Sequence, residues 1–242
     1  MPEGQSKLKE TLHVLDQLRQ GQAGQLSPVA EAGLEPQMAL LRAWQTERLA
    51  RTYADLLESP RYGRACRFFL SDIYAPRDFS QRDQNFERLH DFLRHSLPAS
   101  SLYVLAGAIE ANRLTRQLDE ALLATLVNDL GMTDTITPEM YVAAYQRCDN
   151  YDERLRQIKL ITEVGQEIDR MVRIPLTGLV LRLARRPARL AGWTAVQDFL
   201  ERGHAAFKQM GGADTFLFTI EQRETHVLNS VFAGDPTLLV ER

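Results

Sequence analysis

The stretch LRQIKLITEVGQEIDRM, residues Leu155–Met171, has the clearest hydrophobic periodicity in the chain. Its apolar residues recur at steps of three or four positions, which places them on one face of an α-helix. These residues are Leu155, Ile158, Ile161, Val164, Ile168 and Met171. A helix with one apolar face normally packs against a core. The stretch therefore predicts a long amphipathic helix in an all-α protein.

The rest of the sequence predicts helices in the same way, and no segment shows the alternation of a β-strand. The expected helices before this stretch cover residues 7–19, 36–57, 63–74, 81–97 and 99–130, with a short one after the loop TDTITPE. Two more are expected at about 193–210 and 214–232. Pro76, Pro98 and Gly131 fit helix boundaries, because proline lacks an N–H and glycine adopts the left-handed cap. The fold class is all-α, a single-domain multi-helix bundle of about eight or nine helices.

The expected domain organisation has one main unit. Residues 1–35 form a weak N-terminal helix and loop, residues 36–232 form the helical bundle domain, and residues 233–242 form a flexible tail. No long flexible linker divides the bundle, and no internal repeat is present.

Composition narrows the classes of function. The chain has 242 residues and a net charge of -3, so no basic surplus predicts a specific nucleic-acid partner. The start of the sequence lacks the apolar core of a signal peptide, and no apolar run approaches the roughly 20 residues of a membrane span. We therefore expect a cytoplasmic protein. Cys66 and Cys148 are too few for a disulfide framework or a zinc site.

The segment CRFFLSDIYAPRDFSQRD, Cys66–Asp83, combines aromatic residues with balanced charges around a proline turn. The aromatic residues fit the packing of two helices across a corner. Arginine and aspartate side chains pair through charge-assisted hydrogen bonds, so the charges either fix the corner or leave an arginine for an anionic ligand. The candidate residues of this network are Arg67, Asp72, Tyr74, Arg77, Asp78, Arg82 and Asp83.

The same segment resembles the signature FFL-x-D-x-Y-x-P-x-D-F-x-x-RD of a family of uncharacterised bacterial proteins. The matching positions are Phe68, Phe69, Leu70, Asp72, Tyr74, Pro76, Asp78, Phe79, Arg82 and Asp83. The resemblance extends to RQIKLITEVG and to VQDFLERG, Val196–Gly203. It implies a cytoplasmic helical protein and gives no catalytic role to any residue.

Two E-x-x-H strings raise the hypothesis of a metal site. Glu10 with His13, and Glu87 with His90, each place a carboxylate and an imidazole on one helix face, as in di-iron bundles. Such bundles also need single carboxylates from two other helices, and Glu47 and Glu110 are the candidates. Iron or manganese would be the metal of a helical oxidoreductase. The alternative is that these residues have ordinary surface or capping roles.

The last predicted helix offers a second candidate pocket. Arg223 and Glu224 lie close to His226 in EQRETHVL, and both His204 and His226 fit core histidines equally well. The sequence contains none of the strings GxSxG, GxGxxG, HExxH or the phosphate-binding P-loop.

The segment RMVRIPLTGLVLRLARRPAR, residues 170–189, contains six arginines and no acidic residue. The arginines are Arg170, Arg173, Arg182, Arg185, Arg186 and Arg189. Three interpretations are open: ion pairs with the rest of the chain, an anionic ligand or protein partner, and an anionic membrane surface.

Together these features predict a binding or regulatory assembly module with an unknown protein or an anionic small molecule as its partner. A metal-dependent helical oxidoreductase and a peripheral membrane-surface protein are the alternatives. Homo-oligomerisation is left open, and no cofactor is expected apart from the metal of the first alternative.

Overall fold

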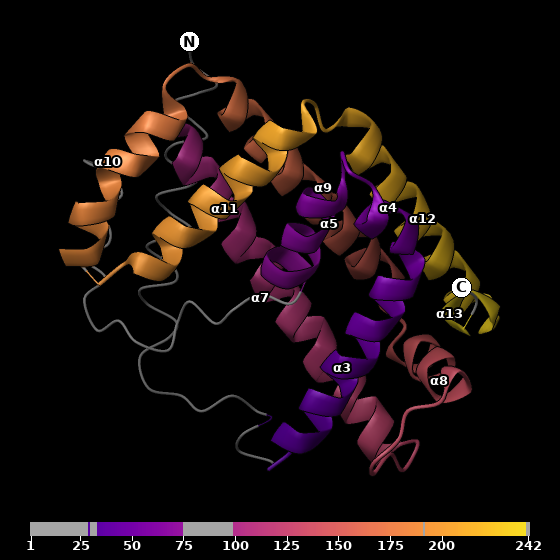
Figure 1. Cartoon of the computed structure of the whole chain (residues 1–242). Helices are drawn as coiled ribbons and strands as arrows, with labels where there is room; N and C mark the ends of the chain where they lie inside the picture. Colours follow the sequence, from indigo (N-terminus) through magenta and orange to yellow (C-terminus); the bar gives the residue numbers. More distant parts are fainter. Residues whose placement is uncertain (1–28, 30–32, 75–98, 191, 241–242) are drawn as a thin grey trace.

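A computed structural model of the chain describes residues 29, 33–74, 99–190 and 192–240. Most of these residues are helical, and none of them forms a β-strand, which confirms the predicted all-α class. The helices expected at residues 7–19 and 81–97 lie outside the described residues. Figure 1 shows the described helices packed around one another, with the ends of the described chain on the outside.

The helices have the following bounds. In the first part of the chain they are α3 (Glu35–Thr52), α4 (Ala54–Glu58), α5 (Gly63–Phe68), the π-helix η1 (Phe69–Tyr74) and α7 (Ala99–Asn128). In the second part they are α8 (Pro138–Cys148), α9 (Tyr151–Arg173), α10 (Thr177–Leu190), α11 (Thr194–Met210), α12 (Asp214–Phe232) and α13 (Thr237–Val240).

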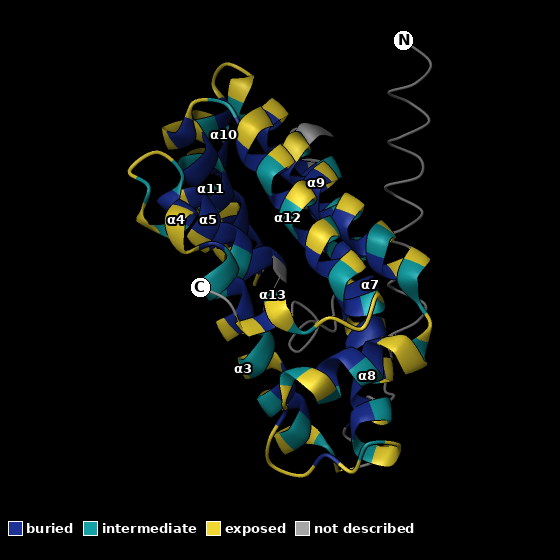
Figure 2. Ribbon diagram, turned by 90° about the vertical axis from the view of Figure 1, so that its right-hand side faces the viewer, coloured by how far each residue is buried: buried dark blue, intermediate teal, exposed yellow. Residues whose placement is uncertain are grey.

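Helix α9 contains the stretch that predicted the fold. It packs against α7, α12 and α11, and more lightly against α10. Five of the six residues on its predicted apolar face are buried, and Leu155 is partly buried. Figure 2 shows the same pattern in neighbouring helices, with buried inner faces and exposed outer faces.

Close packing of α9 depends on Gly165. A Cβ atom at this position would lie 2.4 Å from Leu217 Cδ2 of α12 and 2.9 Å from Phe69 Cζ of η1. Both neighbours are themselves buried. The absence of a side chain therefore allows α9 to approach α12 and η1 together.

We expect Gly165→Ala to destabilise the protein. Overpacking of this kind typically costs about 1–3 kcal/mol, and the better helix propensity of alanine returns about 1 kcal/mol at most. Glu163→Ala is the matched control, because Glu163 is exposed on the same helix. Urea unfolding of both variants measures the difference. Equal free energies of unfolding for Gly165→Ala and the unmodified protein would contradict the packing constraint.

Two predicted helices differ in detail from the structure. The helix expected at 36–57 is interrupted at Tyr53, where the backbone has φ -114° and ψ 19° and separates α3 from α4. The helix expected at 63–74 begins and ends as predicted, but its second half is the π-helix η1. Tyr53 is buried and donates a hydrogen bond to Glu224, so a tertiary contact holds the ring where α3 ends.

Helix ends elsewhere follow the predicted signals. Gly131 has φ 67° and follows α7, and Thr137 caps α8 by accepting a hydrogen bond from the Met140 backbone N–H at 3.2 Å. The segment after residue 232 contains α13, whose Leu239 is buried. Its carbonyl accepts a hydrogen bond from Arg51 of α3 at 2.9 Å.

The described core divides into two apolar clusters. The first joins α5, η1 and α11 to the inner faces of α7, α9, α10 and α12. The second joins α8 and α13 to the other ends of α3, α7 and α12, with Ile158 of α9. Helices α3, α7, α9 and α12 contribute to both clusters. The two clusters therefore share a boundary that these four helices cross.

Candidate functional site

Buried polar side chains gather where the four shared helices pass from one apolar cluster to the other. On α3 this position lies between Leu41 and Leu49, and on α12 it lies between Ile220 and Val227. We call the buried polar residues there the polar layer. Its members are Arg48, Thr115, Asp119, Arg154, Gln157 and Glu224. Buried polar groups are costly unless they are paired, so the contacts within this layer matter for stability.

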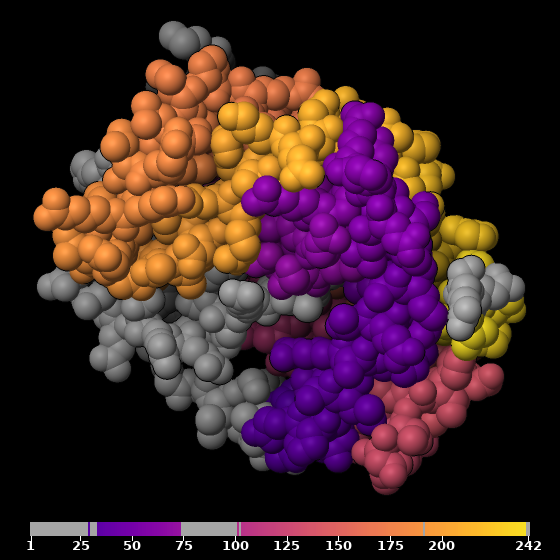
Figure 3. All heavy atoms as spheres, in the orientation of Figure 1, coloured from indigo at the N-terminus to yellow at the C-terminus, as the bar shows by residue number. Residues whose placement is uncertain are grey.

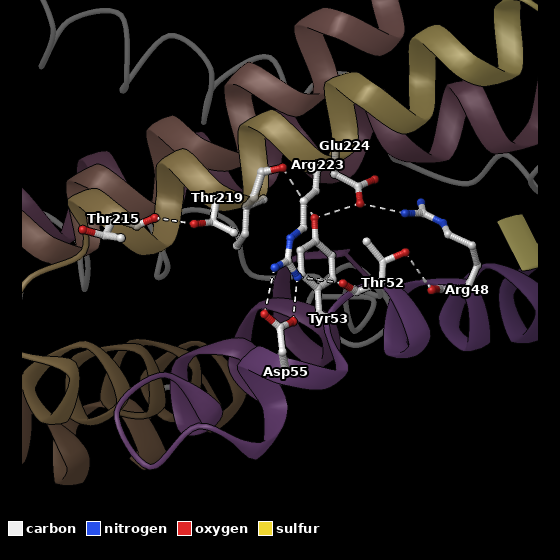
Figure 4. Close-up of polar contacts among 9 residues, drawn as sticks. Arg48, Thr52, Tyr53, Asp55, Thr215, Thr219, Arg223 and Glu224 are labelled. Carbon is white, nitrogen blue, oxygen red and sulfur yellow. Dashed lines mark hydrogen bonds and ion pairs between the residues drawn. The ribbon is translucent and has the colours of Figure 1, made fainter. Parts of the chain in front are cut away.

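Glu224 of α12 is held by two side chains from the end of α3. Arg48 Nη1 donates to Glu224 Oε1 at 2.6 Å, and the Tyr53 hydroxyl donates to the same oxygen at 2.8 Å (Figure 4). Burial lowers the pKa of Arg48, but the neighbouring Glu224 carboxylate outweighs burial, and the pKa of Arg48 lies above its ordinary value. The pair is therefore an ion pair inside the bundle.

A second contact of α12, with the end of α3 and the start of α4, lies nearer the surface. Arg223 donates two hydrogen bonds, of 2.6 and 2.8 Å, to the Asp55 carboxylate (Figure 4). It also donates to the Thr52 carbonyl. The hydrogen bond from Arg223 lowers the pKa of Asp55. Consecutive residues of α12 thus contact the chain on either side of the Tyr53 break.

Glu224→Leu should destabilise the protein strongly. The substitution leaves a buried guanidinium without its carboxylate, which typically costs about 3–5 kcal/mol. The double variant Arg48→Met/Glu224→Leu removes both charges and should recover much of this loss, because a well-packed apolar pair often matches a buried ion pair. Urea unfolding measures both free energies. Additive losses in the double variant would show that the two residues do not act as a pair.

Arg154 of α9 occupies the centre of the polar layer. Its Nη2 donates to the Leu118 carbonyl at 2.9 Å, and its Nη1 donates to Gln157 and lies 3.6 Å from Asp119 Oδ1. The guanidinium carbon lies 4.6 Å from the centre of the Tyr145 ring, within the range of a cation–π contact. Arg154 therefore joins α7, α8 and α9 through charge and through an aromatic face.

Asp119 is a buried carboxyl whose partners do not fully offset the effect of burial on its pKa. Burial raises the pKa of Asp119 above its ordinary value, although Arg154 and the hydrogen bond from Gln45 at 3.1 Å act in the opposite direction. Tyr141 and Tyr145, joined by a hydrogen bond of 3.0 Å between their hydroxyls, lie on the α8 side. Burial also raises the pKa of Tyr141, so this phenol stays neutral at ordinary pH.

The raised pKa of Asp119 predicts a pH dependence of stability. The contribution of this group is fully present below the ordinary aspartate pKa of about 4 and is lost as pH rises through the higher folded-state pKa. The unmodified protein should therefore lose stability relative to Asp119→Asn as the pH increases above the ordinary aspartate pKa of about 4. Denaturant unfolding of both proteins across this pH range measures the difference.

Asp55→Asn provides a control of opposite sign. Its carboxyl has a lowered pKa, so its contribution is present above the ordinary value and disappears as pH falls through the folded-state pKa. The unmodified protein should gain stability relative to Asp55→Asn as pH rises. The same trend for both aspartate variants would be inconsistent with the burial of Asp119.

A cavity of about 350 Å³ lies against the polar layer. Its walls come from α3, α7, α8, α9 and α12 and include four arginines and two acidic residues: Arg42, Arg48, Arg116, Arg154, Asp119 and Glu224. Arg42 and Arg116 are exposed, whereas the other four are buried, so the charged wall extends from the interior to the surface. Tyr141, Tyr145 and several aliphatic side chains provide the apolar part of the wall.

Two arginine nitrogens at the cavity lack an acceptor. The Nε atoms of Arg48 and Arg154 are buried, and neither has a hydrogen-bond partner within the described part of the chain. Buried donors are nearly always satisfied in folded proteins, so these two donors are exceptions. The arrangement can hold an anionic or strongly polar group through charge-assisted hydrogen bonds.

The predicted corner network is described only in part. Arg67 donates to the Leu57 carbonyl at 3.3 Å, and the buried Asp72 forms an ion pair with Arg202 of α11 at 2.5 Å. These two candidates therefore have partners outside the corner. The side chain of Tyr74 and the candidates Arg77, Asp78, Arg82 and Asp83 lie outside the described residues, so the network stays a prediction.

The predicted arginine segment spans the end of α9 and most of α10. Three of its arginines form ion pairs within the chain: Arg170 with Glu167, Arg173 with Asp169, and Arg185 with Glu201. Arg182 donates to the Gly178 carbonyl. Arg186 and Arg189 are exposed, and the described residues give neither an ion pair.

The residues proposed for a metal site do not meet in the described structure. Glu47 pairs with Arg51, and Glu110 pairs with Arg113 and Arg156. Glu10, His13, Glu87 and His90 lie outside the described residues, and the described ones contain no cluster of three or more metal-binding side chains. The metal hypothesis stays a prediction that depends on Glu87 and His90.

Sequence reasoning identified one member of the polar layer, Glu224, as part of a candidate pocket. Its neighbours in that prediction point elsewhere: Arg223 binds Asp55, and His226 is exposed. The other members were missed. A signal was present in α9, where Arg154 lies four residues before Ile158 on the apolar face, and polar residues on such a face often belong to a site.

The chain belongs to a family described as a domain of unknown function, DUF8198, whose model matches residues 25–238. The match agrees with the predicted kinship to an uncharacterised family, while the particular signature and a bacterial origin stay predictions. The chain has no significant match among curated proteins or among solved structures. None of the described helices is long and apolar enough to cross a bilayer.

Proposed function

We propose that the protein is a binding module that holds a small anionic molecule in the cavity beside the polar layer. The observation that carries this proposal is the presence of four arginines in the wall of one cavity. Two of them, Arg48 and Arg154, are buried and fixed by ion pairs. Donors that are already buried and fixed by ion pairs lose little freedom when they bind an acceptor, which favours binding.

Charge supports an anion over a cation. The cavity wall has four arginines against two carboxylates, a surplus of two positive charges. Arg48 and Arg154 are matched by Glu224 and Asp119, so the surplus lies with the exposed Arg42 and Arg116. Exposed arginines at the edge of a cavity attract an anion, and their guanidinium groups bind carboxylate or phosphate with two hydrogen bonds.

The rest of the wall indicates the shape of the ligand. A volume of about 350 Å³ is at the lower end of small-molecule sites, which excludes a large cofactor. The Tyr141 and Tyr145 rings, whose centres lie 4.7 Å apart, contribute apolar wall, and Gln157 and Thr115 contribute polar side chains. We infer a compact metabolite that joins a carboxylate or phosphate to an apolar body.

Trp44 provides a direct test of this proposal. Its ring stacks on Tyr141 with the ring centres 4.2 Å apart, whereas the other tryptophan, Trp193, is buried in the first apolar cluster. In a Trp193→Phe background, fluorescence therefore reports on Trp44 alone. Titration with phenyl phosphate should give a saturable change, and inorganic phosphate should compete with it.

Arg42→Gln/Arg116→Gln should weaken binding of phenyl phosphate about tenfold or more, because charged hydrogen bonds contribute about 1.5–3 kcal/mol each. Both arginines are exposed, so the variant should fold normally. Arg147→Gln, an exposed change on α8 away from the cavity wall, should bind as the unmodified protein does. No saturable signal, or equal affinity in the Arg42/Arg116 variant, would overturn the proposal.

A further inference from the structure

Helix α10 has two apolar faces, and only one of them is covered. Thr177, Leu181, Ala184 and Ala188 are buried, at the spacing of a single helix face that packs mainly on α11. Gly178 allows this close contact, because a Cβ there would lie 2.9 Å from the His204 ring. The helix is thereby held against the bundle along one side.

The opposite face of α10 exposes leucines. Leu179, Leu183 and Leu190 follow the four- and seven-residue steps of one helix face, and Leu176 precedes the helix. Leu183 and Leu190 expose 69% and 78% of their surface, and Leu176 exposes 72%. The described part of the chain exposes seven large hydrophobic residues in this way, and five of them, from Ile174 to Leu190, belong to this region.

Arginines border this leucine row. On a helical wheel Arg186 lies beside the leucines, and Arg182 and Arg189 follow on the same side. All three are exposed. Glu201, the nearby acid on α11, is already paired with Arg185 through contacts of 2.6–3.0 Å, and the next acid along α11 before it is Asp198. The outer face therefore combines apolar residues with positive charge, and no acid in the described part of the chain forms an ion pair with Arg186 or Arg189.

We propose that this face of α10, which we call the leucine–arginine face, docks on an anionic phospholipid bilayer. The leucines would enter the boundary between headgroups and acyl chains, and the arginines would bind lipid phosphates and carboxylates. An anionic bilayer offers apolar acyl chains to the leucines and negatively charged headgroups to the arginines. The whole chain has a net charge of -3, so an anionic bilayer repels it overall. This face is locally positive and is the exception.

The position of α10 permits such docking. The helix lies on the outer edge of the bundle in Figure 1, and in Figure 3 its atoms form the rim of the molecule beyond α11. Its fourteen residues are too short to span a bilayer but suit a helix that lies in the interface plane. Arg186 and Arg189 have no ion pair to break within the described structure before they reach the lipid.

The test is flotation of the full chain with vesicles of phosphatidylcholine alone and of phosphatidylcholine mixed equally with phosphatidylserine. We expect binding to the mixed vesicles only. Leu183→Ser should reduce the partition coefficient about tenfold or more, because a leucine side chain loses its burial. Arg186→Glu should reduce it at least about fivefold, in line with the attraction of one basic residue near an anionic surface.

Matched controls lie elsewhere on the molecule. Phe218→Ser removes an exposed apolar residue from α12, and Arg147→Glu reverses an exposed charge on α8, at the opposite end of the bundle from α10. Both should bind mixed vesicles as the unmodified protein does. Circular dichroism should show the same melting temperature for Leu183→Ser and the unmodified protein, since Leu183 is exposed.

Three results would overturn the proposal. One is the absence of binding to mixed vesicles; a second is equal binding to pure phosphatidylcholine. The third is unchanged binding of Leu183→Ser and Arg186→Glu, which would place the membrane contact elsewhere. If vesicle binding is absent and Leu183→Ser converts a dimer to a monomer in light scattering, the face instead joins two copies of the chain.

Discussion

The structure depends on how a bundle core accommodates a buried carboxylate. Glu224 lies on the inner face of α12, where Ile220 and Val227 on either side belong to different apolar clusters. An isolated carboxylate at this depth would cost several kcal/mol, so it requires partners. Arg48 and Tyr53 supply them from the end of α3. One buried carboxylate thus joins α12 to the end of α3.

The remainder of the polar layer follows the same rule. Each buried polar residue that α7 and α9 contribute is paired with a residue on another helix: Gln157 with Thr115, and Arg154 with the Leu118 carbonyl. Such contacts add little net stability compared with an apolar core. Because hydrogen bonds are directional, however, they allow few alternative arrangements of the helices. We interpret the layer as the feature that fixes the register of the four shared helices. The same residues line the cavity.

Binding in the cavity and docking through α10 would use separate parts of the molecule. The cavity walls come from α3, α7, α8, α9 and α12, whereas α10 packs mainly on α11. Helix α9 contacts both regions, with Arg154 near its start and Arg173 at its end. A protein that holds an anionic metabolite beside an anionic membrane would suit a role in sensing or presenting that metabolite, and the two proposals stand or fall separately.

The sequence by itself determined most of the helices, because helical periodicity and terminators such as Gly131 are local properties of the chain. It did not predict α10, which contains Pro187, or the short α13. It also determined that α9 is amphipathic, and that residues 170–189 combine arginines with apolar residues. Only the tertiary structure decided which polar residues face inward together. Arg48, Asp119, Arg154 and Glu224 are far apart in the sequence, and no local pattern shows that they meet. Their proximity results from the packing of α3, α7, α9 and α12. Likewise, the irregular backbone at Tyr53 coincides with its contact with Glu224, a residue 171 positions later, and no local signal predicts a contact at that separation.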